Sequence, residues 1–255
     1  MEGFNHSVPK SEKMVSEEKI IQKPEIKEGV DFIFNQHSEL LKIGTKEQYS
    51  EYINTIFPES KFKDIFYHGT ASKSKIENFN FERSNFAKAV FFTKDRKFAE
   101  SFAFDDSRDG NVQEQILDIK NPFDFSNKEH IQELRPIIEE LVKEGYKSEN
   151  TNITFRNDLP QINIGEKEIQ NPSIEDFVDH YIWRLENGSW RIIETDRVID
   201  FISKKYDSIL INERGITNIA VFNPDQIHVL GSQVDIDKFS NFIGITTENK
   251  TELNN

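Results

Sequence analysis

The sequence predicts an α+β fold from three observations. Two short apolar runs that are rich in aromatic residues, at 64–68 and 89–93, are bounded by polar or turn residues and are typical of strands. Three further strand-like runs lie near the C-terminal end and are joined by the short segments ERG and NPD, as antiparallel neighbours are. Helical segments separate the two groups of strands, and this segregation is typical of α+β domains.

The composition indicates one globular domain with appendages. Among 255 residues, 22 phenylalanines provide the large apolar surfaces that a core needs, although only 36% of the residues are hydrophobic. The net charge of −13 argues against a mainly electrostatic grip on a nucleic-acid backbone. Cysteine is absent and the 6 histidines are scattered, so disulfides and thiolate-bound zinc are excluded and we expect no metal site.

Both ends of the chain are polar. Residues 1–28 are rich in Lys, Glu, Ser and Pro and, like residues 246–255, are predicted to be flexible tails. The N-terminus lacks the apolar segment of a signal peptide, and no apolar run approaches the roughly 18 residues of a membrane span. We therefore expect a cytoplasmic protein without a membrane partner, although delivery into another cell is compatible with the sequence.

A short helical arm is predicted over residues 29–58, before a domain over residues 59–245. In the arm, Thr45 and Gln48 form a capping box at the start of an amphipathic helix, and Pro58 stops that helix. We expect this helix to pack on the domain that follows it.

Two further elements are predicted in the first half of the domain. The second strand-like run leads directly into a short helix over 94–104, for which Thr93 or Asp95 provides the cap. Another strand is predicted to begin at position 111 and to end at Asn121 and Pro122, because proline cannot donate to a strand ladder.

A helical insertion is predicted at about 124–190. Its first helix is expected to begin with a capping box of Ser126 and Glu129, and Pro136 is expected to kink or split it. The segment 173–188 has the clearest amphipathic pattern in the chain and predicts a second helix.

Three side chains near the end of the insertion have simple structural interpretations. Trp183 and Trp190 are expected to pack within the insertion. Glu194 lies near the start of a further predicted helix at 195–205, where a carboxylate stabilises the helix dipole.

His68 ends the first strand-like run, in the segment FYHGT. A lone histidine at this place has two interpretations, a structural hydrogen-bond partner or a site residue. The sequence contains no G-x-S-x-G, G-x-G-x-x-G or G-x-x-x-x-G-K-[ST] segment, so a hydrolase elbow and the familiar phosphate loops are not indicated. A flat aromatic ligand such as nicotinamide would stack on an aromatic ring, and Gly69 would let its carboxamide approach the main chain.

Three segments in this order resemble the ADP-ribosyltransferase superfamily: YHGT at 67–70, KAVFFTKDRKFAESFA at 88–103 and TNIAVFNPDQIHVLGS at 217–232. The likeness is to the branch marked by His, Tyr and Glu, and within it to the polyvalent ADP-ribosyltransferase-like domains of phages and other mobile elements. It runs motif by motif from about 63 to 232, and the insertion is not matched. The resemblance implies split antiparallel sheets around a cleft that binds NAD as the substrate.

By this resemblance, the His-Gly-Thr triplet holds the nicotinamide half of NAD. His68 would contact a ribose hydroxyl, while the backbone of Gly69 and the hydroxyl of Thr70 would bind the carboxamide. Phe91 falls on the position of the aromatic residue that stacks on nicotinamide. Arg83, in the loop before the aromatic strand, would either bind the diphosphate of NAD or remain a solvated surface residue.

One position departs from the family pattern. The catalytic glutamate of the family binds the 2′-hydroxyl of the nicotinamide ribose and stabilises positive charge at the anomeric carbon, and it falls on Asn218 here. An amide keeps a hydrogen bond but supplies no charge, and losing one such group commonly lowers a rate about 10²- to 10³-fold. Glu213, at the turn before that strand, is the candidate replacement.

The sequence therefore predicts an NAD-dependent mono-ADP-ribosyltransferase that releases nicotinamide. Its acceptor is not specified by the resemblance, and the acidic charge favours a protein acceptor over nucleic acid. Two alternatives follow from the same residues. Asn218 motivates a degenerate module that binds NAD or ADP-ribose without catalysis, and precedent in the fold motivates a nucleic-acid ADP-ribosyltransferase.

Overall fold

The computed structural model describes residues 29–252, apart from positions 75, 78, 80, 82–88, 106–107, 150 and 214. Strands and helices segregate along this part of the chain, so the predicted α+β class is confirmed. The strands of the main sheet are β1 (Phe66–Thr70), β2 (Val90–Thr93), β5 (Asn111–Leu117), β6 (Pro122–Asp124), β9 (Ser208–Glu213), β10 (Ile216–Val221) and β11 (Ile227–Val229). Two small hairpins pair β3 (Phe104–Asp105) with β4 (Arg108–Asp109) and β7 (Gln161–Ile164) with β8 (Lys167–Gln170).

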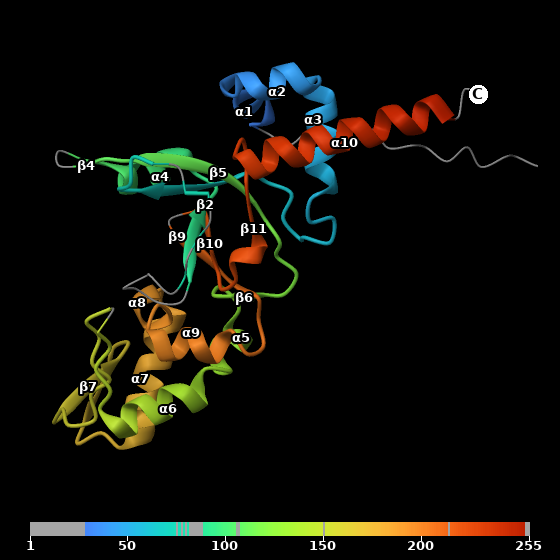
Figure 1. Cartoon of the computed structure of the whole chain (residues 1–255). Helices are drawn as coiled ribbons and strands as arrows, with labels where there is room; N and C mark the ends of the chain where they lie inside the picture. The colour runs from blue at the N-terminus through green and yellow to red at the C-terminus, as the bar shows by residue number, and fades with distance from the viewer. Residues whose placement is uncertain are drawn as a thin grey trace, which may run out of the picture.

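The main sheet consists of two groups of strands that barely meet. Its order is β11-β5-β1-β2-β10-β9-β6, and every pairing is antiparallel except that of β6 with β9. Five residue pairs join β1 to β5 and four join β2 to β10, but among the described residues β1 meets β2 only where Tyr67 lies opposite Thr93. Figure 1 shows β5 running across the view and β2 and β10 running down it. This is the split antiparallel arrangement that the resemblance implied.

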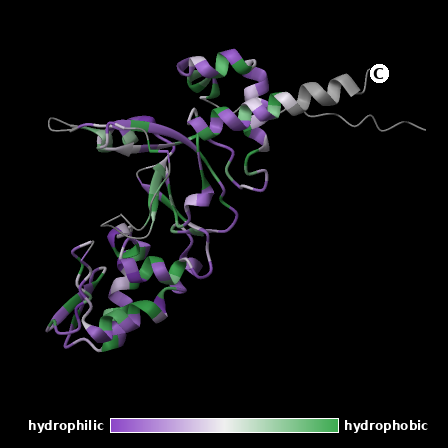
Figure 2. Cartoon of the chain, in the orientation of Figure 1, coloured by the Kyte–Doolittle hydropathy of each residue, from purple (hydrophilic) through white to green (hydrophobic). Residues whose placement is uncertain are grey.

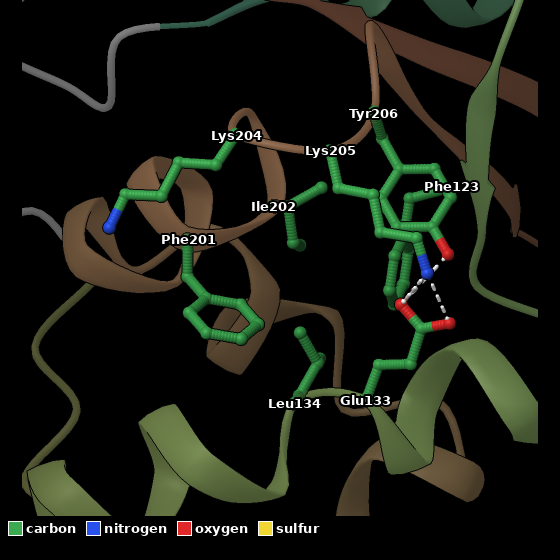
Figure 3. Close-up of a pocket in the computed structure, with 8 residues that line it drawn as sticks. All are labelled: Phe123, Glu133, Leu134, Phe201, Ile202, Lys204, Lys205 and Tyr206. Carbon is green, nitrogen blue, oxygen red and sulfur yellow. Dashed lines mark hydrogen bonds and ion pairs between the residues drawn. The ribbon is translucent and has the colours of Figure 1, made fainter.

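The segment after β5 differs from the prediction. We expected one strand from position 111 to Asn121 and Pro122, but β5 ends at Leu117 and the separate strand β6 begins at Pro122. The chain crosses here from one strand group to the other, because β5 lies beside β1 whereas β6 lies beside β9 at the opposite edge. Hydrophobic residues follow the central strands between these edges (Figure 2).

Helices α1 (Val30–Gln36), α2 (Ser38–Ile43) and α3 (Lys46–Thr55) lie within residues 29–58, which we call the N-terminal arm. The capping box of Thr45 and Gln48 is present at the start of α3, as predicted. The arm packs against α10 (Gln233–Glu252), with Tyr49 and Phe239 fully buried between them (Figure 1). Residues 246–255 were expected to be a flexible tail, but α10 continues to Glu252, so residues 246–252 are helical.

A buried carboxylate connects the arm to the sheet. Asp235, which is inaccessible to solvent, accepts hydrogen bonds from the Tyr49 hydroxyl at 2.6 Å and the Gly231 backbone N–H at 2.7 Å. Its other oxygen lies 2.7 Å from Nε2 of His228 on β11. A buried carboxylate is tolerated only when donors satisfy it, so this network fixes α3, α10 and β11 relative to one another.

The helical region between β6 and β9 contains α5 (Lys128–Gln132), α6 (Arg135–Glu144), α7 (Ile174–Glu186), α8 (Trp190–Ile193) and α9 (Asp196–Ile202). The predicted split at Pro136 and the predicted helix over α7 are both present. The expected capping box of Ser126 and Glu129 is wrong: Asn127 caps α5, while the Ser126 hydroxyl donates to Asp124. Helices continue to Ile202, so the helical region extends beyond position 190.

Candidate functional site

A cavity of about 690 Å³ lies where the two strand groups meet α4 (Arg96–Ala103) and the helical region. This volume is within the range of small-molecule sites. Strand residues form most of the wall, α4 adds three residues, and the helical region adds three more. The side chains on which the chemistry of the cavity depends are His68, Phe91, Trp190, Glu194, Glu213 and Asn218.

His68 is held in one orientation and one protonation state. Its Nδ1 lies 2.9 Å from the carbonyl oxygen of Phe91, and a carbonyl only accepts, so Nδ1 carries the hydrogen of a neutral ring. Burial lowers the pKa of His68, and the bond to Phe91 opposes this only in part, so the ring is neutral at pH 7. An edge contact with Phe79 and a tilted contact with Phe92 hold the ring in place. Nε2 therefore offers a lone pair to a hydroxyl group.

Gly69 lies under α4. A Cβ at this position would come within 1.9 Å of the carbonyl oxygen of Ala99, so only glycine allows α4 to approach β1 this closely. The sequence suggested another reason for this glycine, the approach of a ligand. Packing of α4 alone already requires it, and Gly69 also borders the cavity.

One predicted NAD-binding residue, Thr70, is not among the described residues of the cavity wall. Thr70 follows Gly69 at the end of β1, where its hydroxyl accepts the backbone N–H of Ser72 at 3.2 Å and keeps its own hydrogen for another acceptor. Arg83 is outside the described residues, and its predicted role stays a prediction.

The paired phenylalanines of β2 alternate between the core and the cavity. Phe92 lies opposite Ile219 and is only 2% exposed within the core of the sheet. Phe91 is half-buried, lies opposite Ala220 and borders the cavity beside His68, whose ring bonds its carbonyl oxygen. Of these two rings, that of Phe91 is therefore the one available to a flat ligand in the cavity, as the alternation of a strand requires.

Asn218 and Glu213 lie on neighbouring strands with their side chains on the same face of the sheet. Asn218 is opposite Ile211, two residues before Glu213, and its Nδ2 donates to the Glu213 carboxylate at 3.3 Å. Asn218 is only 7% exposed, and its Oδ1 has no partner among the described residues. The amide thus orients a carboxylate on the neighbouring strand.

Glu194 is a further cavity residue that the sequence interpretation missed. It is the C-cap residue of α8, directly before the N-cap residue of α9, and it borders the cavity. Burial, followed by the negative charge of Glu213, raises the pKa of Glu194 to about 7, while Arg191 opposes the shift. Trp190, expected to pack within the insertion, borders the same cavity. No local signal marks either residue, because their place depends on how the helical region folds back onto the sheet.

The family model for ADP-ribosyltransferases in polyvalent proteins matches residues 63–233, which is about two thirds of the chain. The chain belongs to this family. The matched range contains every described residue of the cavity wall and leaves the N-terminal arm and most of α10 outside. Searches of the curated proteins and of the solved structures found no match.

Two absences hold for the part of the chain that the structure describes. None of its helices there combines the length and apolar character that a membrane span requires. In the same residues, acidic, histidine and cysteine side chains do not gather in groups of three or more that would suit a metal ion.

Glu194 predicts a pH dependence of stability. With its folded pKa near 7 and its unfolded pKa near 4.5, the folded state binds more protons than the unfolded state between these values. The free energy of unfolding therefore falls as the pH rises through this window. Glu194→Gln removes the buried charge and should be more stable than the wild type by about 1–3 kcal/mol at pH 8 but not at pH 4.

Urea unfolding at both pH values measures this difference. Glu166→Gln, in the exposed turn between β7 and β8, is the matched control and should follow the wild type. A Glu194→Gln variant that is less stable than the wild type at pH 8 would contradict this prediction, because it would show that the ionised Glu194 carboxylate does not destabilise the folded state.

Proposed function

We propose that this protein is an NAD-dependent mono-ADP-ribosyltransferase that transfers ADP-ribose to an acceptor and releases nicotinamide. The observation that carries the proposal is the meeting of His68, Phe91 and Glu213 in one cavity, in a chain that belongs to an ADP-ribosyltransferase family. ADP-ribosyltransferases use NAD as their substrate, and the net charge of −13 favours a protein acceptor over nucleic acid.

The split in the sheet supports binding of the nicotinamide half of NAD. Beyond Tyr67, the main chain of β1 has β5 on one side, and the described residues place no strand on the other. The backbone of Gly69 and the hydroxyl of Thr70 would bind the carboxamide there, while Phe91 stacks on the ring. Nε2 of His68 would accept the hydrogen of a ribose hydroxyl.

Glu213 would supply the charge that Asn218 lacks. Positive charge develops at the anomeric carbon as the bond to nicotinamide loosens, and a fixed carboxylate lowers the energy of that state. The hydrogen bond from Asn218 holds the carboxylate in place before the substrate binds, so little reorganisation is needed.

A non-catalytic module that binds NAD or ADP-ribose is the second candidate. Asn218 at the position of the family's glutamate is the observation that favours it. The two candidates differ in one step, because a binding module would hold NAD without releasing nicotinamide.

His68→Ala is expected to weaken NAD binding at least about tenfold, because it removes the ring that would accept a ribose hydroxyl. Isothermal titration calorimetry with NAD measures this. His180→Ala is the matched control, since the ring of His180 makes the same type of bond, 2.7 Å to the carbonyl of Asn163, outside the cavity. Equal affinity in the His68→Ala variant and the wild type would exclude the assigned site.

Glu213→Gln is expected to lower the rate of nicotinamide release about 10²- to 10³-fold while changing the affinity for NAD only a few-fold, because charge at the anomeric carbon develops only in the transition state. The double variant Glu213→Gln/Asn218→Glu moves the carboxylate to the neighbouring strand and should recover much of the rate. Glu166→Gln, in an exposed turn, controls for lost charge.

Single-turnover release of labelled nicotinamide measures all four proteins. A Glu213→Gln rate equal to that of the wild type would show that Glu213 does not replace the missing glutamate. NAD binding without any release in the wild type would favour the binding module.

A further inference from the structure

The cavity has an acidic and aromatic wall. Its described residues include the carboxylates of Glu194 and Glu213 but no lysine or arginine. Aromatic rings form much of the remaining wall, contributed by Phe91, Phe98, Phe102 and Trp190. Carboxylates together with aromatic faces attract cationic side chains and repel anionic ones.

The two carboxylates come from different parts of the fold. Glu213 lies on β9 and is held by Asn218, where it would stabilise the ribosyl cation. Glu194 comes from the helical region with Trp190 and Thr151, and is not needed for that role. The buried Asn218 Oδ1, without a partner among the described residues, is a further acceptor for an N–H group in the same cavity.

We propose that the acceptor is a cationic nitrogen side chain of a protein, arginine or lysine, and that Glu194 takes the proton which this nitrogen loses. The inference rests on the proposed function and adds the class of acceptor. The helical region would then contribute a catalytic residue, while the strands hold NAD.

The transfer step balances without a further reagent. The bond between the anomeric carbon and the nicotinamide nitrogen breaks, and its electron pair stays on nicotinamide, which leaves as a neutral molecule. An N–H bond of the acceptor breaks: its proton passes to the Glu194 carboxylate and then to solvent, and the electron pair left on the nitrogen forms the new bond to the anomeric carbon.

The charges around Glu194 suit a base that acts near neutral pH. The groups that face it are Glu213 on β9, Arg191 on its own helix and, in the same cavity, the neutral ring of His68. Because burial and Glu213 raise its pKa to about 7, transfer should increase as the pH rises through that value and then level off.

The test uses the full chain, labelled NAD and four peptides that differ only in one central residue, Arg, Lys, Glu or Ser. Transfer to the peptide and hydrolysis of NAD are measured together. Transfer to the Arg or the Lys peptide should exceed transfer to the Glu and Ser peptides at least about tenfold. Comparison of the Arg peptide with the Lys peptide shows which of the two side chains is the acceptor. Glu194→Gln should lower the ratio of transfer to hydrolysis at least about tenfold and remove the inflection near pH 7, whereas Glu166→Gln keeps both.

Four results would overturn the inference. Preferred transfer to the Glu or Ser peptide, or to an added oligonucleotide, would exclude a cationic acceptor. An unchanged ratio in Glu194→Gln would exclude its role as the base. Release of nicotinamide without transfer to any cationic peptide would overturn this inference alone, whereas no release with any acceptor or with water would overturn the proposed function as well.

Discussion

The separation of β1 from β2 after one residue pair determines where the site can form. Past Tyr67 and Thr93 the two strand groups diverge, and the bond between the ring of His68 and the carbonyl of Phe91 spans the gap. This bond replaces a ladder contact, so it stabilises the opening and fixes the histidine ring at the same time. The close approach of α4 at Gly69 then covers one side of the gap. The divergence of β1 from β2 thus determines both the geometry of the sheet and the position of the cavity.

Electrostatics in the cavity come from side chains that are far apart in the sequence. Asn218 holds Glu213 across a hairpin, and the negative charge of Glu213 contributes to the raised pKa of Glu194, which belongs to another unit of the fold. Two carboxylates in one partly buried space cost free energy when both are ionised. A positively charged ligand or transition state lowers that cost. The pair of carboxylates would therefore favour binding of a cation in this cavity.

Local signals in the sequence predicted the parts of the fold that depend on near neighbours. The capping box at Thr45 and the split at Pro136 both act within a few residues, and the structure contains each of them. Local competition explains one error, since Asn127 caps α5 in place of Ser126. Long-range packing explains the others. The crossing from β5 to β6, the burial of Asp235 and the place of Glu194 depend on contacts between distant segments, which periodicity and spacing do not encode.

The central claim is that this cavity holds the nicotinamide half of NAD with a carboxylate from β9 beside the ribose. A crystal structure of the full chain with a non-hydrolysable NAD analogue tests it most directly. We predict a nicotinamide ring stacked on Phe91, a ribose hydroxyl within hydrogen-bond distance of His68 Nε2, and the Glu213 carboxylate next to the anomeric carbon. An analogue bound elsewhere, or a Glu213 carboxylate turned away from the ribose, would contradict the claim.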